Sequence, residues 1–248
     1  MYCRPTYREC VGTYYQFCPV SKALEVLDER WTLLVVRELL MGSRHFNDIR
    51  RGVPRMSPAL LVKRLQRLER VGVVERHPDG NKVVYQLTPA GKDLQPIVDS
   101  LGDWSMRWLP ELGDEDLDPH LLLWDMRRQV SRTDLPPGRT VVHVQFGDVT
   151  PKSQRWWLVL AHDDADVCDF DPGLPVAVTV ETTLRCMTLL WRGETSWREA
   201  VRTGELTATG SRTATRAVPR WLNVRGAPGD PRPTFSVVGR LATDLRPS

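Results

Sequence analysis

The apolar positions in the first part of the chain recur with the period of α-helices. Pro19 opens a pattern typical of a first helix, and residues Trp31–Met41 predict a second, more buried one. Gly42 follows as a helix stop signal. A short helix is expected over His45–Ile49, and Gly52 ends it soon after.

The next helix is the most informative one. Ser57 is a plausible N-cap with Pro58 at the first helical position, and the helix is expected to run to about Val71. Its buried stripe has the spacing i, i+4 and i+7 and consists of Leu61, Leu65 and Leu68. Ala59, Val62, Lys63 and Gln66 share the opposite face, which Arg64, Arg67 and Arg70 flank or extend with positive charge. A short helix, a turn and such a helix predict a helix-turn-helix, whose second helix enters the major groove of DNA.

A β-hairpin is expected directly after this helix. Residues 73–76 and 82–87 alternate as strands, and His77–Asn81 contains the Asp-Gly pair that favours a tight turn. This hairpin would form the wing of a winged helix-turn-helix. Thr88-Pro89 then begins a last helix that runs to Trp108 with an apolar face, for which the mate in a homodimer is the expected partner.

The second half of the chain has a different pattern. Helices are expected at 121–128, 184–191, 196–203 and 213–222, and strands at 140–146, 155–162, 167–170, 176–182 and 206–209. This order predicts an α+β domain with an antiparallel sheet. The predicted organisation is a DNA-binding domain over 1–112, a linker and helix over 113–137, and a second domain over 138–248.

Charge supports a polyanion-binding face. The 248-residue chain has a net charge of only +3, but the segment from Arg44 to Arg76 contains nine basic side chains and only three acidic ones. An acidic stretch follows at 111–118. Such a local basic excess favours DNA as partner, although a solvated charged helix is the simpler alternative.

Other classes of protein find little support. No segment has the roughly 18 apolar residues that span a bilayer, and Met1–Cys10 lacks the apolar core of a signal peptide, so a cytoplasmic location is expected. The five cysteines show no CxxC spacing. The acidic run Asp163–Asp171 does not follow the EF-hand order, and nucleotide-binding loops and catalytic constellations are missing. We therefore expect no enzyme activity, no metal and no cofactor.

Several linked motifs resemble the HxlR-type winged-helix regulators, which are relatives of the MarR group. The motifs extend from about Phe17 to Trp108 and comprise Cys18-Pro-Val, Trp31-Thr-Leu-Leu-Val-Val-Arg-Glu-Leu-Leu, Arg44-His-Phe-Asn-Asp-Ile, Met56-Ser-Pro-Ala-Leu-Leu-Val-Lys-Arg-Leu-Gln-Arg-Leu-Glu and Tyr85-Gln-Leu-Thr-Pro-Ala-Gly. The resemblance implies a homodimeric transcriptional regulator that binds palindromic double-stranded DNA.

The resemblance also implies which side of the recognition helix faces DNA. With the neighbouring basic and wing residues, the predicted DNA contacts are Arg44, Ser57, Pro58, Ala59, Val62, Lys63, Arg64, Gln66, Arg67, Arg76, His77, Asn81 and Lys82. Family members often carry an arginine where Ala59 stands and a polar residue where Val62 stands. These two apolar side chains could instead touch thymine methyl groups.

Cys18 matches an N-terminal cysteine that some such regulators use as a redox sensor. A position beside a helix start lowers the pKa of a thiol, which favours reactivity. A partly buried structural thiol is the alternative, and the sequence leaves both open.

The second domain resembles the sterol-carrier-protein fold over roughly 138–223. That resemblance implies an apolar cavity for a small hydrophobic ligand, with candidate wall residues Leu189, Leu190, Trp191, Trp197 and Trp221. Ordinary core packing of these tryptophans is an equally weighted alternative. The chain is thus expected to be a regulator with a sensor or dimerisation domain. The other possibility is a lipid or small-molecule binding protein in which the winged helix mainly dimerises.

Overall fold

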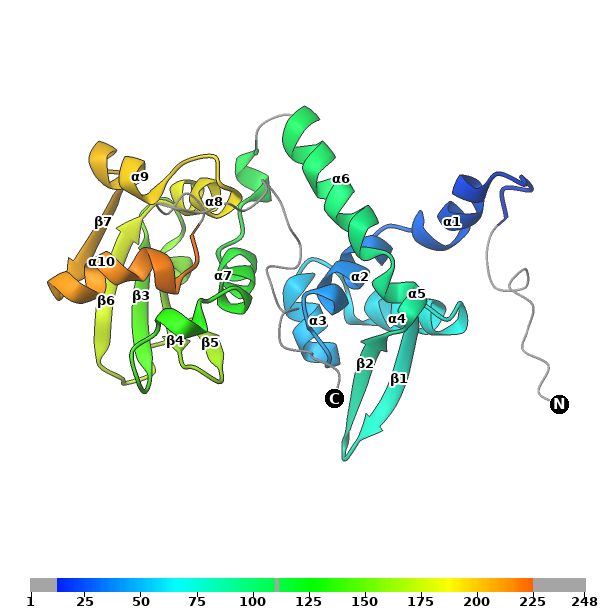
Figure 1. Cartoon of the computed structure of the whole chain (residues 1–248), viewed down its shortest axis with the longest axis horizontal. Helices are drawn as coiled ribbons and strands as arrows, with labels where there is room; N and C mark the ends of the chain where they lie inside the picture. The colour runs from blue at the N-terminus through cyan, green and yellow to red at the C-terminus, as the bar shows by residue number, and fades with distance from the viewer. Residues whose placement is uncertain (1–12, 110–111, 225–248) are drawn as a thin grey trace. The chain divides into compact units, whose positions relative to one another are not determined.

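The computed structural model describes residues 13–109 and 112–224. These residues divide into two units, one over 13–107 and one over 108–224, and each is described by itself (Figure 1). The elements of the first unit are α1 (Pro19–Leu27), α2 (Thr32–Leu40), α3 (Phe46–Gly52), α4 (Pro58–Arg70), β1 (Val74–Asp79), β2 (Lys82–Leu87), α5 (Pro89–Lys92) and α6 (Gln95–Trp108). This is the element order of a winged helix-turn-helix.

The predicted start of α4 is confirmed. Ser57 has extended backbone, and its Oγ accepts a hydrogen bond from the N–H of Leu60 at 3.3 Å, while Pro58 fills the first turn. The helix ends at Arg70, one residue earlier than expected, and Gly72 follows with a φ of 76°. The capping chemistry therefore fixes both ends of this helix.

The hairpin is longer than the sequence pattern indicates. Asp79 pairs with Lys82, so the turn consists of only Gly80 and Asn81, with Gly80 at a φ of 56°. The expected five-residue turn at His77–Asn81 is wrong, because Pro78 lies inside β1. Proline is tolerated there because this two-stranded ribbon leaves one side of each strand unpaired.

The helix predicted from Thr88-Pro89 to Trp108 is split into α5 and α6. Thr88 caps α5 by accepting the Gly91 N–H at 3.1 Å. The cause of the break is Pro96, which has no N–H to continue the helical bonds of α5 and lies in the first turn of α6.

One apolar cluster holds the first unit together. The leucine stripe of α4 is buried against α2, α3 and the start of β1, and its members are Val35, Val36, Leu39, Ile49, Val53, Met56, Leu61, Leu65, Leu68 and Val74. Burial of the stripe leaves the other side of α4 toward solvent.

The second unit is an α+β arrangement. Its elements are α7 (Pro119–Arg128), β3 (Thr140–Phe146), β4 (Arg155–Leu160), β5 (Ala165–Cys168), β6 (Val176–Thr182), α8 (Leu184–Arg192), α9 (Trp197–Thr203), β7 (Leu206–Gly210) and α10 (Arg212–Trp221). The predicted bounds of β3 and β6 are confirmed, and the other strands and helices shift by a few residues. The segment 113–137, expected as a linker and helix, contributes α7 to the core of this unit.

The sheet is mixed, so the expectation of an antiparallel sheet is wrong in one pair. The strand order is β5-β4-β3-β6-β7, and β3 and β6 are parallel. Cys168, at the end of β5, pairs with Trp157 of β4, and Trp157 pairs with His143 in the middle of β3. Strand β6, by contrast, begins beside Val141, near the start of β3. Residues 169–175 must therefore run back along the sheet, and β6 starts in the direction of β3.

One face of this sheet carries the core. Alternate residues of β3, namely Val142, Val144 and Phe146, are buried in one cluster with side chains of α7, α8 and α10. The other face of β3 includes His143, whose ring stacks on Trp157 with centroids 4.7 Å apart. Burial and nearby Arg155 lower the pKa of His143.

No helix among the described residues is long and apolar enough to cross a membrane.

Candidate nucleic-acid interface

The exposed side of α4 lies opposite its leucine stripe. Since Leu61, Leu65 and Leu68 are fully buried, helical geometry turns the intervening positions outward. The side chains on this exposed face are Ser57, Pro58, Ala59, Val62, Lys63 and Gln66. These six residues comprise one cation, apolar groups, a hydroxyl and an amide, and the exposed Arg70 follows one turn after Gln66.

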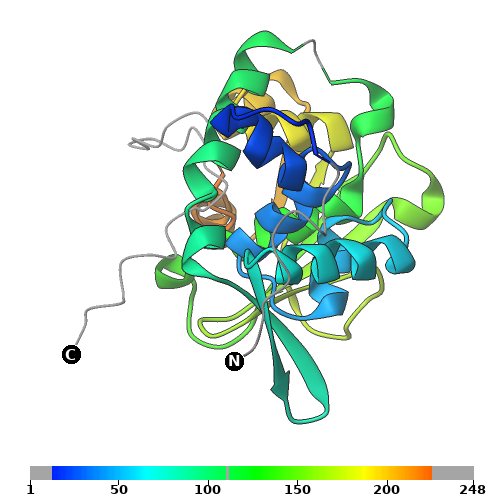
Figure 2. The same ribbon diagram turned by 90° about the vertical axis from the view of Figure 1, so that its right-hand side faces the viewer.

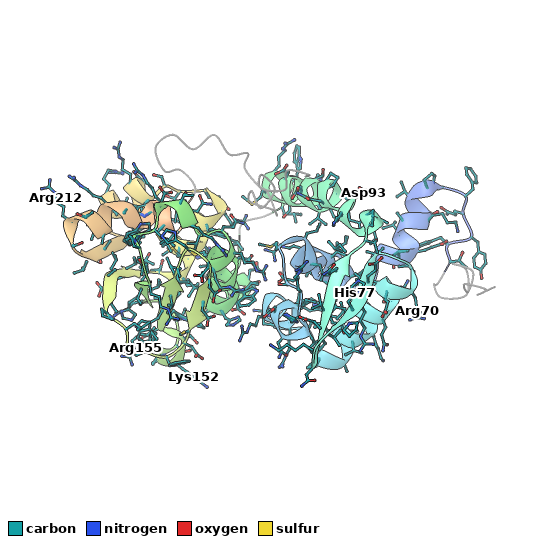
Figure 3. All side chains as sticks on the ribbon, turned by 60° about the horizontal axis from the view of Figure 1, so that its bottom comes forward. Arg70, His77, Asp93, Lys152, Arg155 and Arg212 are labelled. Atoms are coloured by element: carbon teal, nitrogen blue, oxygen red, sulfur yellow. The ribbon has the colours of Figure 1, made fainter. Side chains whose placement is uncertain are left out.

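The hairpin β1–β2 adds a second exposed group of polar side chains. Arg76, His77, Asn81 and Lys82 are all exposed, and Figure 2 shows the hairpin projecting from the helices of its unit. The imidazole Nε2 of His77 lies 3.2 Å from a carboxylate oxygen of the exposed Glu75. Figure 3 labels His77 on the hairpin and Arg70 near the end of α4.

Arg44 is held beside the hairpin by the backbone. The N–H of Tyr85 donates to the carbonyl of Arg44 at 2.8 Å, and His45 forms a β-bridge with Val84. The Nδ1 atom of His45 also lies 3.2 Å from the carbonyl of Val83. The side chain of Arg44 is exposed next to the wing strand.

Arg64 and Arg67 differ from the other predicted contacts. Both guanidinium groups form ion pairs with the carboxylate of Glu29, and only 16% and 12% of their side chains are exposed. Arg64 Nε also donates to the carbonyl of Arg30 at 3.1 Å, and Arg67 donates to the carbonyl of Glu25 at 2.5 Å. These two arginines therefore fasten α4 to the α1–α2 junction, so they are not available cations in this arrangement.

Glu29 is the residue that sequence reasoning missed. Its partners lie 35 and 38 positions later in the chain, and only the packing of α1 beside α4 brings the charges together. Glu25, on the same junction, has its pKa held below the ordinary value by the Lys22 ammonium and by the Tyr14 N–H. The α1–α2 junction thus places acidic residues against the edge of the recognition helix that carries Arg64 and Arg67.

Helix α6 presents an exposed apolar stripe. Its large members are Ile97, Leu101, Trp104 and Trp108, and Trp104 and Trp108 are 54% and 68% exposed. Pro96, Ile97, Ser100, Leu101 and Trp104 line a shallow groove of about 500 Å³. An apolar stripe of this extent on a helix is typical of a protein–protein contact surface.

Cys18 is the N-cap residue of α1 and is partly exposed. Its carbonyl accepts hydrogen bonds from Ser21 Oγ at 2.8 Å and from the Lys22 N–H at 3.1 Å. Cys168 and Cys186 are also free thiols, whereas Cys3 and Cys10 lie outside the described residues. The redox hypothesis for Cys18 stays a prediction.

The candidate ligand-pocket residues belong to the packed second unit. Leu190 and Trp221 are buried in its core, and Trp191 and Trp197 pack against that core. The indole N–H of Trp221 donates to the carbonyl of Asp134 at 2.9 Å. Leu189 is partly exposed.

Within 13–109 and 112–224, no group of three or more His, Cys, Asp or Glu side chains could hold a metal ion.

Known proteins match the first unit. The family model of the HxlR-like helix-turn-helix matches residues 26–112. The HTH-type transcriptional regulator YvaP of Bacillus subtilis is 38% identical over 98 residues, which are 38% of this chain and 91% of that protein. The HTH-type transcriptional regulator Rv3095 of Mycobacterium tuberculosis is 41% identical over 96 residues, or 37% of this chain and 59% of that protein. A structure of the reduced form of YodB from B. subtilis is 32% identical, covers 40% of this chain and has a TM-score of 0.35.

Proposed function

The chain belongs to the HxlR-like helix-turn-helix family and is a DNA-binding transcriptional regulator, and on that premise we propose that it binds a palindromic operator as a homodimer. In this proposal α4 enters the major groove of each half-site and the β1–β2 wing contacts the flanking phosphates. The observation that supports it most is the exposed face of α4 opposite the buried leucine stripe, with Lys63 as its cation.

The proposed contacts divide by chemistry. Ala59 and Val62 offer apolar contacts to thymine methyl groups, and Gln66 offers an amide to base edges. Lys63 and the wing residues Arg76 and Lys82 offer cations to phosphates, which set position and affinity. Arg64 and Arg67 are left out of the proposed contacts because both guanidinium groups are held in ion pairs with Glu29.

Replacement of Lys63 by Ala tests the groove assignment. Loss of one phosphate contact should reduce the slope of log affinity against log salt by about 0.9 per protomer and weaken binding at every salt concentration. The measurement is a salt titration of full-length protein on random-sequence duplex DNA. Lys92→Ala, which removes an exposed lysine on α5, is the matched control. An equal loss in both variants would mean that the effect is one of net charge and that α4 is not the contact.

The homodimer proposal rests on the apolar stripe of α6. Buried at an interface, an aromatic side chain such as Trp104 is a typical hot spot that contributes 2 kcal/mol or more, so Trp104→Glu should raise the dimer dissociation constant by about 30-fold or more. Analytical ultracentrifugation measures it. Val201→Glu introduces the same charge at an exposed apolar position of α9 and should leave the dimer intact. A Trp104→Glu protein that remains as dimeric as the control would sink the assignment of α6.

The second unit is proposed as a sensor or a second dimer contact. Its α+β architecture is compatible with the proposed resemblance to sterol-carrier proteins, and a hydrophobic-ligand sensor is the finer form of the proposal. A ligand would change DNA affinity only if it favoured one dimer geometry over another. Sensing, the redox role of Cys18 and a cytoplasmic location stay predictions.

A further inference from the structure

Helix α10 carries three arginines on one exposed face. Arg212, Arg216 and Arg220 are four residues apart, which places successive guanidinium groups on one side of the helix at a rise of about 6 Å each. All three side chains are exposed, and Figure 3 shows Arg212 at one end of α10, pointing away from its unit. We refer to these three residues as the arginine ridge.

The opposite face of α10 explains why the arginine ridge points outward. Ala214, Val218 and Trp221 are buried in the core of the second unit. Ser211 caps the helix by accepting the N–H of Ala214 at 3.2 Å. The core contacts fix the rotation of α10 about its axis, so the arginine ridge is a defined feature of the surface.

The guanidinium groups of the arginine ridge form no hydrogen bond or ion pair with any residue of 13–109 or 112–224. Most other arginines of this unit are engaged. Those with side-chain partners include Arg127, Arg128, Arg132, Arg185, Arg192 and Arg202. The 3-10 turn Arg132–Asp134 lies next to α10 and contains an acidic residue, Asp134. The carboxylate of Asp134 accepts a hydrogen bond from the Ser131 hydroxyl.

The arginine ridge is a local concentration of positive charge on a unit that is acidic overall. Residues 112–224 contain 16 Asp and Glu against 13 Lys and Arg, so the unit as a whole is slightly acidic. Three uncompensated cations gathered on one helix face of an acidic unit indicate an anionic partner. Guanidinium groups bind phosphate oxygens in bidentate geometry, and the phosphates of a duplex can reach an exposed helix face.

We propose that the arginine ridge binds phosphates of DNA that flanks the operator, as a second contact independent of base sequence. This inference rests on DNA binding by the first unit. Once that unit is bound, the covalent connection keeps α10 at a high effective concentration near flanking duplex, so even weak phosphate contacts add to the affinity. The second unit would then lengthen the DNA footprint of each protomer.

Two duplex lengths test the proposal with the full-length protein. A duplex of about 20 base pairs, selected from a randomised pool, accommodates two half-sites one helical turn apart, and a duplex of about 40 base pairs adds flanks. The test variant is R212Q/R216Q/R220Q. The matched control is R139Q/K152Q/R198Q, which removes the same charge from three exposed positions of the same unit outside α10. Thermal unfolding checks that both variants retain the fold.

We expect the ridge variant to lose affinity on the long duplex only. On that duplex, the slope of log affinity against log salt should fall by up to about 2.7 per protomer, which is 0.9 for each lost phosphate contact. On the short duplex it should bind like the wild type, and the control should bind like the wild type on both. Equal behaviour of the ridge variant and the control on the long duplex would overturn the proposal, as would equal losses on both lengths. If the wild-type protein binds neither duplex, DNA binding by the first unit fails as well.

Discussion

Replacement of Glu29 by Gln should strengthen the binding of random-sequence DNA and make it more sensitive to salt. The carboxylate of Glu29 forms ion pairs with both Arg64 and Arg67, so its removal frees two guanidinium groups on the recognition helix. If both reach phosphates, the slope of log affinity against log salt should steepen by up to about 1.8 per protomer. Fluorescence anisotropy on a labelled random duplex over a range of salt concentrations measures this slope.

The same substitution should lower the discrimination between operator and random DNA. Without the Glu29 ion pairs, α4 loses its connection to the α1–α2 junction, and base contacts need a fixed helix whereas phosphate contacts do not. Loss of a charged partner at this largely buried site should also lower the free energy of unfolding by about 1–3 kcal/mol. A purely structural role of Glu29 would weaken operator and random binding together.

A charge-matched control separates this effect from a change in net charge. Glu69 is exposed on α4 itself, and Glu69→Gln should leave the salt slope close to that of the wild type. The combined variant E29Q/R64Q/R67Q should return the slope to the wild-type value. If Glu29→Gln leaves the slope of log affinity against log salt unchanged, the two arginines do not become available to DNA when Glu29 is removed.

Replacement of Gly91 by Ala should destabilise the winged-helix unit severely. A Cβ atom at this position would lie 2.2 Å from the backbone carbonyl oxygen of Val73 and 2.8 Å from the side chain of Leu87. A backbone carbonyl cannot rotate away as a side chain can. Val73 O also accepts the N–H of Thr88 at 3.1 Å, which would have to shift too. The cost should therefore be at the upper end of that for overpacking, about 3 kcal/mol.

Calorimetry gives the readout. For a unit of this size, such a loss should lower the midpoint of its thermal transition by about 12 °C or more. Gly147→Ala is the control, because its Cβ would meet only the Thr182 carbonyl at an ordinary 3.9 Å. A Gly91→Ala protein that unfolds at the wild-type temperature would contradict the close contact.

The elements that sequence reasoning located well are those with local signals. Ser57, Pro58 and the leucine stripe of α4 lie within one helix, so capping and periodicity suffice to place it. The ends of β3 and β6 are likewise marked by local signals, in the residues that directly flank each strand. Their mutual direction depends on the path of residues 169–175, and an alternating pattern is the same in parallel and antiparallel strands.

The ion pairs at the candidate site could not be predicted, for a related reason. Arg64 and Arg67 are basic residues on a helix with a DNA-reading pattern, and nothing within α4 reveals that both form ion pairs with Glu29. The exposure of Lys63, by contrast, follows directly from its position relative to Leu61 and Leu65. Sequence patterns thus predicted which face of α4 is outside, but not which charges on its edges are already paired.

The two-residue turn at Gly80 and Asn81 makes the wing easy to alter in evolution and in the laboratory. Nothing lies within 4 Å of a Cβ atom built on Gly80, and Asn81 is exposed. Residues inserted at such a tip displace no packed group, and each doubling of a loop costs only about 0.6 kcal/mol in closure entropy. Descendants of this chain can therefore diversify in wing length while the helices stay unchanged, and a peptide tag introduced there would report on the wing without disturbing the core.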